Sequence, residues 1–137
     1  MSIVSFAMAL FAGVTSLAAG NVGTALVLFL VLTVVAVLTS PRAFPKSVSD
    51  ASARAASAVD GRPIVYWRPG CPFCIRLRAS LGRDANRLHW VDIWADPEGA
   101  ASVRAVADGN ETVPTVITAS EAMVNPQPDR VRELARA

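Results

Sequence analysis

The feature that most constrains this chain is where its charges lie. No charged side chain occurs before Arg42, whereas all 13 Lys and Arg residues and all 11 Asp and Glu residues lie at or after that position. The chain therefore divides into an apolar N-terminal third and a polar remainder whose composition is typical of a globular domain. With 137 residues in all, there is room for about one such domain.

The apolar third is long enough for two membrane helices. As a single helix, residues 3–38 would be about 54 Å long, whereas the hydrocarbon core of a bilayer is about 30 Å thick. A glycine-flanked break, "AAGNVG" at Ala18–Gly23, divides the stretch. The sequence thus predicts a transmembrane helical hairpin in residues 1–39, with helices at about 3–19 and 22–38. A cleavable signal peptide is the alternative for the first helix, but "MSIVSF" has no positive n-region.

The positive charges that follow the second helix predict its orientation. Arg42, Lys46 and Arg54 come after it, while the turn between the helices carries no charge. The positive-inside rule then places the polar domain on the cytoplasmic face of the cytoplasmic membrane. Residues 40–61 are predicted to be a linker, because Pro41 and Pro45 end the helix. The Ala- and Ser-rich part of this linker suits either a short helix over residues 47–59 or a flexible tether, and we favour a partly helical tether.

The polar domain, residues 62–137, alternates strand and helix patterns. Strands are predicted at 63–67, 87–93, 112–118 and 121–125, and helices at 71–83, 96–109 and 128–137. The order predicts an α/β fold of the mixed α+β kind, a four-stranded mixed sheet with flanking helices. Trp67, Trp90 and Trp94 are expected to pack in the core or at the sheet edge rather than to form a binding platform, and His89 is expected to be structural or on the surface.

Both cysteines of the chain lie in one short stretch, "RPGCPFCIR". Cys71, Cys74 and His89 supply at most three N or S ligands, and structural zinc needs about four, so a metal site would have to be shared between chains. A C-x-x-C pair that opens a helix after a strand is instead typical of redox proteins. We therefore interpret the pair as a reversible dithiol and expect no metal.

The predicted position of each thiol assigns it a different role. Thiol–disulfide exchange requires a thiolate, and the unpaired N–H groups at a helix N-terminus favour one. Cys71 is predicted at that terminus, with Pro72 at the first helical position and the charge of Arg68 nearby. Cys74 lies one turn into the helix and is more shielded. Cys71 is therefore the predicted nucleophile and Cys74 the resolving thiol.

A proline within an otherwise regular strand also needs an explanation. If the Val113–Pro114 peptide bond is cis, the backbone of Val113 lies beside the dithiol. Its N–H and C=O groups are then available to an extended thiol substrate, which would bind as an added strand. The alternative is a trans proline at the edge of the sheet.

Four stretches of the domain, "YWRPGCPFCIRLR", "VDI", "GNETVPTV" and "NPQPDRVREL", together resemble glutaredoxins. The most similar pattern is that of the actinobacterial mycoredoxin branch, which uses mycothiol in place of glutathione. The resemblance runs from about residue 63 to the C-terminus, excludes the apolar third and implies a thioredoxin-like fold. It implies these site residues: Cys71 as the attacking cysteine, Cys74 as the second, and Thr112, Val113 and Pro114 as the substrate-facing loop. We expect Arg68 and Phe73, beside the thiols, to contact substrate as well.

Two departures from the resemblance concern the thiol substrate. Glutathione-binding members usually carry a Gly-Gly pair after the third strand, whereas this chain has "TASEAM" there. That difference favours another low-molecular-weight thiol. The Cys-Pro-Phe-Cys sequence is nevertheless closer to dithiol glutaredoxins than to the Cys-Gly-Tyr-Cys of some mycoredoxins.

These observations predict a membrane-tethered thiol–disulfide oxidoreductase that reduces protein–mycothiol mixed disulfides or protein disulfides. Its expected partners are the membrane, a disulfide-bearing client protein and a low-molecular-weight thiol co-substrate, mycothiol rather than glutathione, with no bound cofactor. The small net charge of +2 gives no reason to expect nucleic acid. Two alternatives remain: a redoxin recharged by a thioredoxin-reductase-like enzyme, and a non-catalytic adaptor or iron–sulfur protein.

Overall fold

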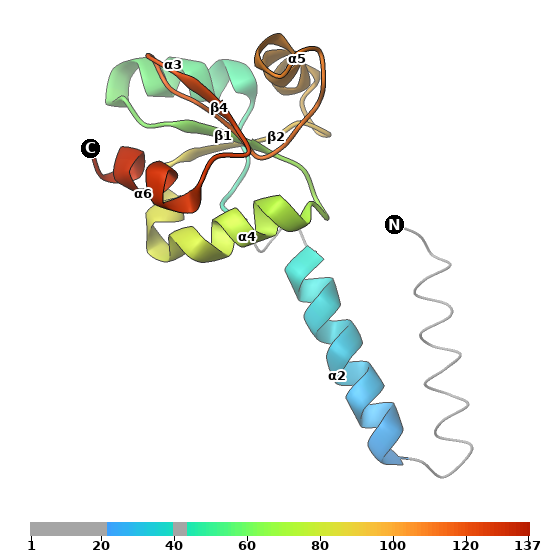
Figure 1. Cartoon of the computed structure of the whole chain (residues 1–137). Coiled ribbons are helices and arrows are strands. Elements are labelled where there is room, and N and C mark those ends of the chain that lie inside the picture. The colour runs from blue at the N-terminus through green and yellow to red at the C-terminus, as the bar shows by residue number, and fades with distance from the viewer. Residues whose placement is uncertain (1–21, 40–43) are drawn as a thin grey trace. The chain divides into compact units, whose positions relative to one another are not determined.

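The structure, a computed structural model, describes residues 22–39 and 44–137 (Figure 1). The chain separates into two compact units, Met1–Leu38 and Thr39–Ala137. We describe each unit by itself.

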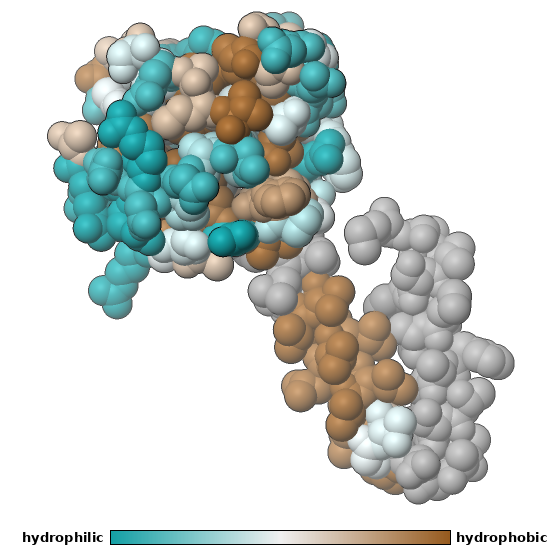
Figure 2. Space-filling model, viewed as in Figure 1, coloured by the Kyte–Doolittle hydropathy of each residue, from teal (hydrophilic) through white to brown (hydrophobic). Residues whose placement is uncertain are grey.

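Helix α2, Val22–Thr39, is the described part of the apolar third. It confirms the helix predicted at 22–38, and Figure 2 shows apolar side chains along it. At ~1.5 Å per residue it is about 27 Å long, less than the ~30 Å of a hydrocarbon core. Among the described residues no helix is long and apolar enough to cross a membrane. The predicted transmembrane hairpin is therefore not confirmed, and its first helix, at 3–19, falls outside the described residues.

The second unit is built on a four-stranded mixed sheet with the strand order β2-β1-β3-β4. Strand β1, Ile64–Trp67, runs parallel to β2, His89–Asp92. On its other side β1 pairs antiparallel with β3, Thr115–Ile117, which pairs antiparallel with β4, Ala122–Val124. The predicted mixed sheet and its flanking helices are thus confirmed. The third strand begins after the cis Val113–Pro114 bond rather than at residue 112.

Helices cover both faces of this sheet (Figure 1). Helices α3, Asp50–Asp60, and α5, Pro97–Val106, lie on one face. Helices α4, Pro72–Leu81, and α6, Pro128–Arg136, lie on the other, and the 3₁₀ helix η2, Gly82–Arg87, continues from α4. Because both faces are covered, every residue of β1 is buried.

Helix α3 lies within the interval 40–61 that the sequence predicts to be a linker. It packs on the sheet through Ala53, which is fully buried, and through Asp50, whose carboxylate accepts a hydrogen bond of 2.6 Å from the Tyr66 hydroxyl. The folded unit therefore begins well before residue 62. The composition did not show this because the packed face of α3 consists of small and acidic side chains rather than a row of large apolar ones.

The chain just before α3 covers the outer edge of the sheet. The N–H of Val48 donates to the carbonyl of Trp90 in edge strand β2 at 2.9 Å, and Ser47 accepts from the N–H of Asp92 at 2.8 Å. Phe44 stacks on Trp67 with ring centroids 3.9 Å apart. This segment satisfies backbone groups that an uncovered edge strand would leave unpaired.

The core contains two of the three tryptophans. Trp67 and Trp90 are each 1% exposed, as predicted, and the indole N–H of Trp90 donates to the carbonyl of Ala85 at 2.7 Å. The prediction is wrong for Trp94, which lies two residues after the end of β2 and is 64% exposed. It lies in the loop after β2, where most of its side chain is left uncovered.

Candidate active site

The sequence places Cys71 at the start of helix α4 by a short turn after β1. Strand β1 ends at Trp67, and Gly70 adopts a positive φ of 75°, which a residue with a Cβ rarely adopts. Cys71 has extended backbone angles and is the N-cap residue of α4, and Pro72 occupies the first helical position. The predicted position of the first thiol at the helix N-terminus is confirmed.

The sulfur of Cys71 has two polar neighbours. It accepts a hydrogen bond from the backbone N–H of Cys74 at 3.3 Å, and as a thiol it donates to the carbonyl of Val113 at 3.4 Å. The first contact satisfies one of the N–H groups left unpaired at the start of α4. That N–H and the partial positive charge of the helix end favour negative charge on a sulfur at this position. Cys71 is buried, with 6% of its surface exposed, whereas Cys74 has none exposed.

Cys74 has a different environment, although it lies one turn away. It is fully buried on the inner side of α4. Burial raises the pKa of the Cys74 thiol well above its usual value, and the hydrogen bond with Cys71 raises this pKa further, while contacts with Arg68 act in the opposite direction. At neutral pH Cys74 is therefore a protonated thiol. Both cysteines are free in the structure.

The proline loop lies against the first thiol. The Val113–Pro114 bond is cis, and both residues are buried. The carbonyl of Val113 contacts the Cys71 sulfur, as the sequence predicts for a cis bond. Thr112 is exposed, and its carbonyl accepts from the Thr115 hydroxyl at 2.8 Å, which holds the turn that leads into β3. The structure thus brings together residues that are 42 positions apart in the sequence, Cys71 and Val113.

Arg68 and Phe73, the other two predicted contact residues, flank Cys71 in the sequence. Phe73 is 55% exposed in the first turn of α4. Arg68 is half-buried, and its guanidinium carbon lies 5.8 Å from the ring centroid of Trp94. Trp94 was not among the predicted contact residues, because it was expected to pack rather than to bind. The available signal was its place just beyond the end of a strand parallel to β1, because the carboxyl ends of parallel strands meet at one edge of a sheet.

A C-x-x-C pair at a helix N-terminus, beside a cis-proline loop on a mixed sheet with helices on both faces, defines a thiol–disulfide oxidoreductase of thioredoxin-like fold. The comparisons with known proteins give the family. The glutaredoxin family model matches residues 64–122, which include β1, both cysteines and the proline loop.

Two relatives come from Mycobacterium tuberculosis, one from strain CDC 1551 / Oshkosh and one from strain H37Rv, and each bears the name "Putative glutaredoxin". Each is 38% identical to this chain over 71 residues, which are 50% of this chain and 82% of the relative. The chain belongs to the glutaredoxin family, and it is a thiol–disulfide oxidoreductase.

Proposed function

We propose that this oxidoreductase reduces mixed disulfides between client proteins and a low-molecular-weight thiol, or disulfides within client proteins, with Cys71 as the attacking residue. The observation that carries this proposal is the environment of the Cys71 sulfur. It caps α4, accepts the Cys74 N–H and lies against the Val113 carbonyl. Developing negative charge on this sulfur has a hydrogen-bond donor in place before the reaction begins.

The first step exchanges one disulfide for another. The Cys71 thiolate attacks the sulfur of the low-molecular-weight thiol, a new S–S bond forms between them, and the client sulfur leaves as a thiolate that takes a proton from solvent. The Val113 carbonyl faces the reacting sulfur. With the adjoining backbone it lines up an extended client segment, as a strand added to a sheet would be.

The adduct on Cys71 is then released by a second thiol. A further molecule of the low-molecular-weight thiol attacks the adduct sulfur, which regenerates the Cys71 thiolate and forms the symmetrical disulfide. In the other route Cys74 gives up its proton and attacks Cys71, which forms the Cys71–Cys74 disulfide and expels the low-molecular-weight thiol. The Cys74 N–H lies 3.3 Å from the Cys71 sulfur, so the two residues are adjacent. In both routes the two electrons come from thiols, so no bound cofactor or metal is required.

We propose mycothiol rather than glutathione as the co-substrate. The stretch after β3 carries no glycine pair, and its turn is held by side chains instead. The Thr118 hydroxyl accepts from the N–H of Ser120 at 3.3 Å and from the N–H of Glu121 at 3.0 Å. A turn fixed in this way has side chains at the positions where glutathione-binding members usually have glycines, which supports a different thiol.

The decisive experiment measures turnover of a client peptide carrying a mycothiol mixed disulfide against the same peptide carrying glutathione. Each thiol is supplied with its own reductase, and NADPH consumption is followed. We expect faster turnover with mycothiol and none for Cys71→Ser, with Ser80→Ala, an exposed position on α4, as a control of wild-type rate. Faster turnover with glutathione would refute the co-substrate, and recharging by thioredoxin reductase alone would refute the thiol-dependent mechanism.

We further propose that the apolar third attaches the enzyme to the cytoplasmic membrane. The second unit, Thr39–Ala137, which we call the redox unit, then faces the cytoplasm. This is supported by the absence of charge before Arg42 and by the large apolar side chains that α2 exposes, among them Leu26 and Phe29. Transfer of such side chains from water into lipid is favourable. We expect the full chain to stay in the membrane pellet after an alkaline wash and a chain that begins at residue 40 to be released. Release of the full chain would contradict the attachment.

A further inference from the structure

Trp94 lies exposed beside the loop that carries the nucleophile. It is 64% exposed, while Trp67 and Trp90 are each 1% exposed. The N–H of Ile93 donates to the carbonyl of Trp67 at 3.0 Å, so this part of the chain runs alongside the carboxyl end of β1. The N–H of Trp94 donates to the Asp92 carboxylate at 3.0 Å, which fixes where the loop begins. The exposed ring is thus held at the edge of the sheet from which the Cys71 turn leaves.

Arg68 connects this ring to the reacting sulfur. Its guanidinium carbon lies 5.8 Å from the centre of the Trp94 ring, within the range of a cation–π contact. Its carbonyl accepts from the N–H of Cys71 at 3.4 Å, so the residue belongs to the turn that positions the nucleophile. The ion pairs formed among the described residues do not include Arg68. Its planar set of N–H donors is therefore available to a ligand.

We propose that Trp94 is a specificity-determining residue, which together with Arg68 forms a platform for a hydroxyl-bearing ring attached to the substrate sulfur. The inference rests on the proposed function, because it concerns the low-molecular-weight thiol that is linked to Cys71. A saturated ring with hydroxyl groups presents C–H groups on its face and oxygen acceptors at its rim. The indole of Trp94 matches the face, and the guanidinium of Arg68 matches the rim.

A peptide thiol would use the same two residues differently. Glutathione has no rigid apolar face, and its carboxylates would pair with the Arg68 guanidinium. Trp94 would then contribute little. The ring-bearing thiol mycothiol and the peptide thiol glutathione should therefore respond differently to removal of the indole, although both form their disulfide with the same sulfur.

The kinetic test uses the full chain with Trp94→Ala and Trp94→Phe, and small mixed disulfides of mycothiol and of glutathione as substrates. For the mycothiol substrate we expect Trp94→Ala to raise KM about three- to tenfold, the loss of one aromatic contact. We expect kcat to change by less than about twofold, because the contact is made equally before and in the transition state. Trp94→Phe should restore most of the loss, and the glutathione KM should change by less than about twofold in either variant.

Val59→Ala is the matched control. Val59 is another exposed apolar side chain, 90% exposed near the end of α3, and it precedes β1 in the chain whereas Cys71 follows β1. It thus lies toward the opposite end of that strand, and its substitution should leave both substrates unaffected. An equal effect of Trp94→Ala on the two substrates, or no effect on either, would overturn the platform.

A binding measurement decides the inference even if the enzyme turns over neither substrate. Because Trp94 is the exposed tryptophan, its fluorescence should change saturably when Cys71→Ser protein is titrated with mycothiol, and should not change with glutathione. The signal should disappear in the variant that also carries Trp94→Phe. If the enzyme turns over neither substrate but mycothiol still changes the fluorescence, only the proposed function is refuted. If mycothiol leaves the fluorescence unchanged, the platform is refuted.

Discussion

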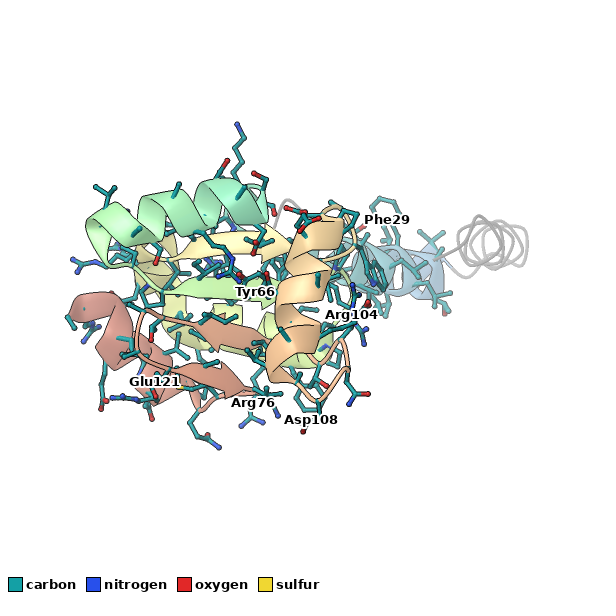
Figure 3. All side chains as sticks on the ribbon, turned by 90° about the horizontal axis from the view of Figure 1, so that it is seen from above. Phe29, Tyr66, Arg76, Arg104, Asp108 and Glu121 are labelled. Carbon is teal, nitrogen blue, oxygen red and sulfur yellow. The ribbon has the colours of Figure 1, made fainter. Side chains whose placement is uncertain are left out.

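At the scale of single residues, burial shifts the pKa of particular polar groups in the redox unit. Tyr66 is the one tyrosine of the chain, and its hydroxyl donates to the buried carboxylate of Asp50 at 2.6 Å. Burial, and then the hydrogen bond to Asp50, raise the pKa of Tyr66 well above its usual value. Asp50 is held in turn by Arg54 at 2.8 Å and by the Ser102 hydroxyl at 3.1 Å. Figure 3 labels Tyr66 and views the sheet from the side that α3 and α5 cover.

The titration of Tyr66 is therefore a direct test of this network. Because the folded pKa lies above the unfolded value of about 10, the contribution of Tyr66 to stability is fully present below about pH 10 and declines as the pH rises further. We expect tyrosinate absorbance of the folded protein to appear only well above pH 10. At neutral pH, Tyr66→Phe should lower the free energy of unfolding by about 1–3 kcal/mol, as measured in urea. A tyrosine that titrates at its ordinary value in folded protein would contradict the network.

The two thiols should likewise react at different rates. Cys71 keeps 6% of its surface exposed, whereas Cys74 is fully buried and the pKa of its thiol is raised by burial. With iodoacetamide at neutral and mildly alkaline pH, we expect peptide mass spectrometry to find the label on Cys71 alone. Protein unfolded in urea, the control, should be labelled at both positions. Equal labelling of the folded protein would show that Cys74 is not shielded.

At the scale of elements, one carboxylate joins two helices. Asp96 caps α5 by accepting from the N–H groups of Glu98 at 3.0 Å and Gly99 at 3.4 Å. Its other oxygen accepts from the N–H of Asp50, the first residue of α3, at 2.6 Å. Gly99 lets α5 approach the sheet, since a Cβ there would lie 2.6 Å from a methyl carbon of Val91. Asp96 thus fixes the start of α5 and ties α3 to the same face of the sheet.

Replacing Asp96 should therefore cost more than the loss of an ordinary helix cap. A cap contributes about 0.5–2 kcal/mol, and Asp96→Ala also leaves the N–H of Asp50 without its acceptor. We expect the free energy of unfolding in urea to fall by about 2–3 kcal/mol. Glu98→Ala, an exposed carboxylate in the same first turn, should change it by about 0.5 kcal/mol or less. Equal effects of the two substitutions would refute the double role of Asp96.

The four strands and the helices α4, α5 and α6 were predictable because each carries a local signal. Apolar runs mark β1 and β2, and the Asp96–Pro97 pair marks the start of α5. The site was indicated by the C-x-x-C spacing that begins at Cys71 and by Pro114 within a strand pattern. The role of α3 was not predictable, because its main polar contact, between Asp50 and Tyr66, joins side chains whose meeting depends on the complete fold. Trp94 was misassigned for a related reason, since composition does not indicate which apolar side chain the tertiary structure leaves uncovered.

At the scale of the whole molecule, the redox unit contains its own core. The members of the buried apolar cluster, from Phe44 to Val131, all belong to the unit Thr39–Ala137. Both Phe44 and Ala53 lie before residue 62, the boundary that the sequence predicts, and both are part of this cluster. The structure therefore indicates that the smallest chain that folds begins near residue 39, whereas the sequence predicts that it begins at residue 62.

Two truncated chains distinguish these boundaries. A chain that begins at residue 40 should unfold in urea in one cooperative transition, because it keeps the whole cluster. A chain that begins at residue 62 loses Phe44 from its stack on Trp67 and all of α3, and should be less stable by at least about 3 kcal/mol or fail to fold. Equal stability of the two chains would show that α3 and the segment before it add nothing to the core.

Trapping the intermediate decides whether the mixed disulfide of the client is attacked by the sulfur of Cys71 and not by that of Cys74. Cys74→Ser protein is mixed with a peptide that carries a mycothiol mixed disulfide, and the products are separated and weighed by mass spectrometry. We expect one mycothiol adduct, located on Cys71, together with an equal amount of free peptide thiol. An intact mixed disulfide, or reaction that persists in Cys71→Ser protein with Cys74 present, would contradict it.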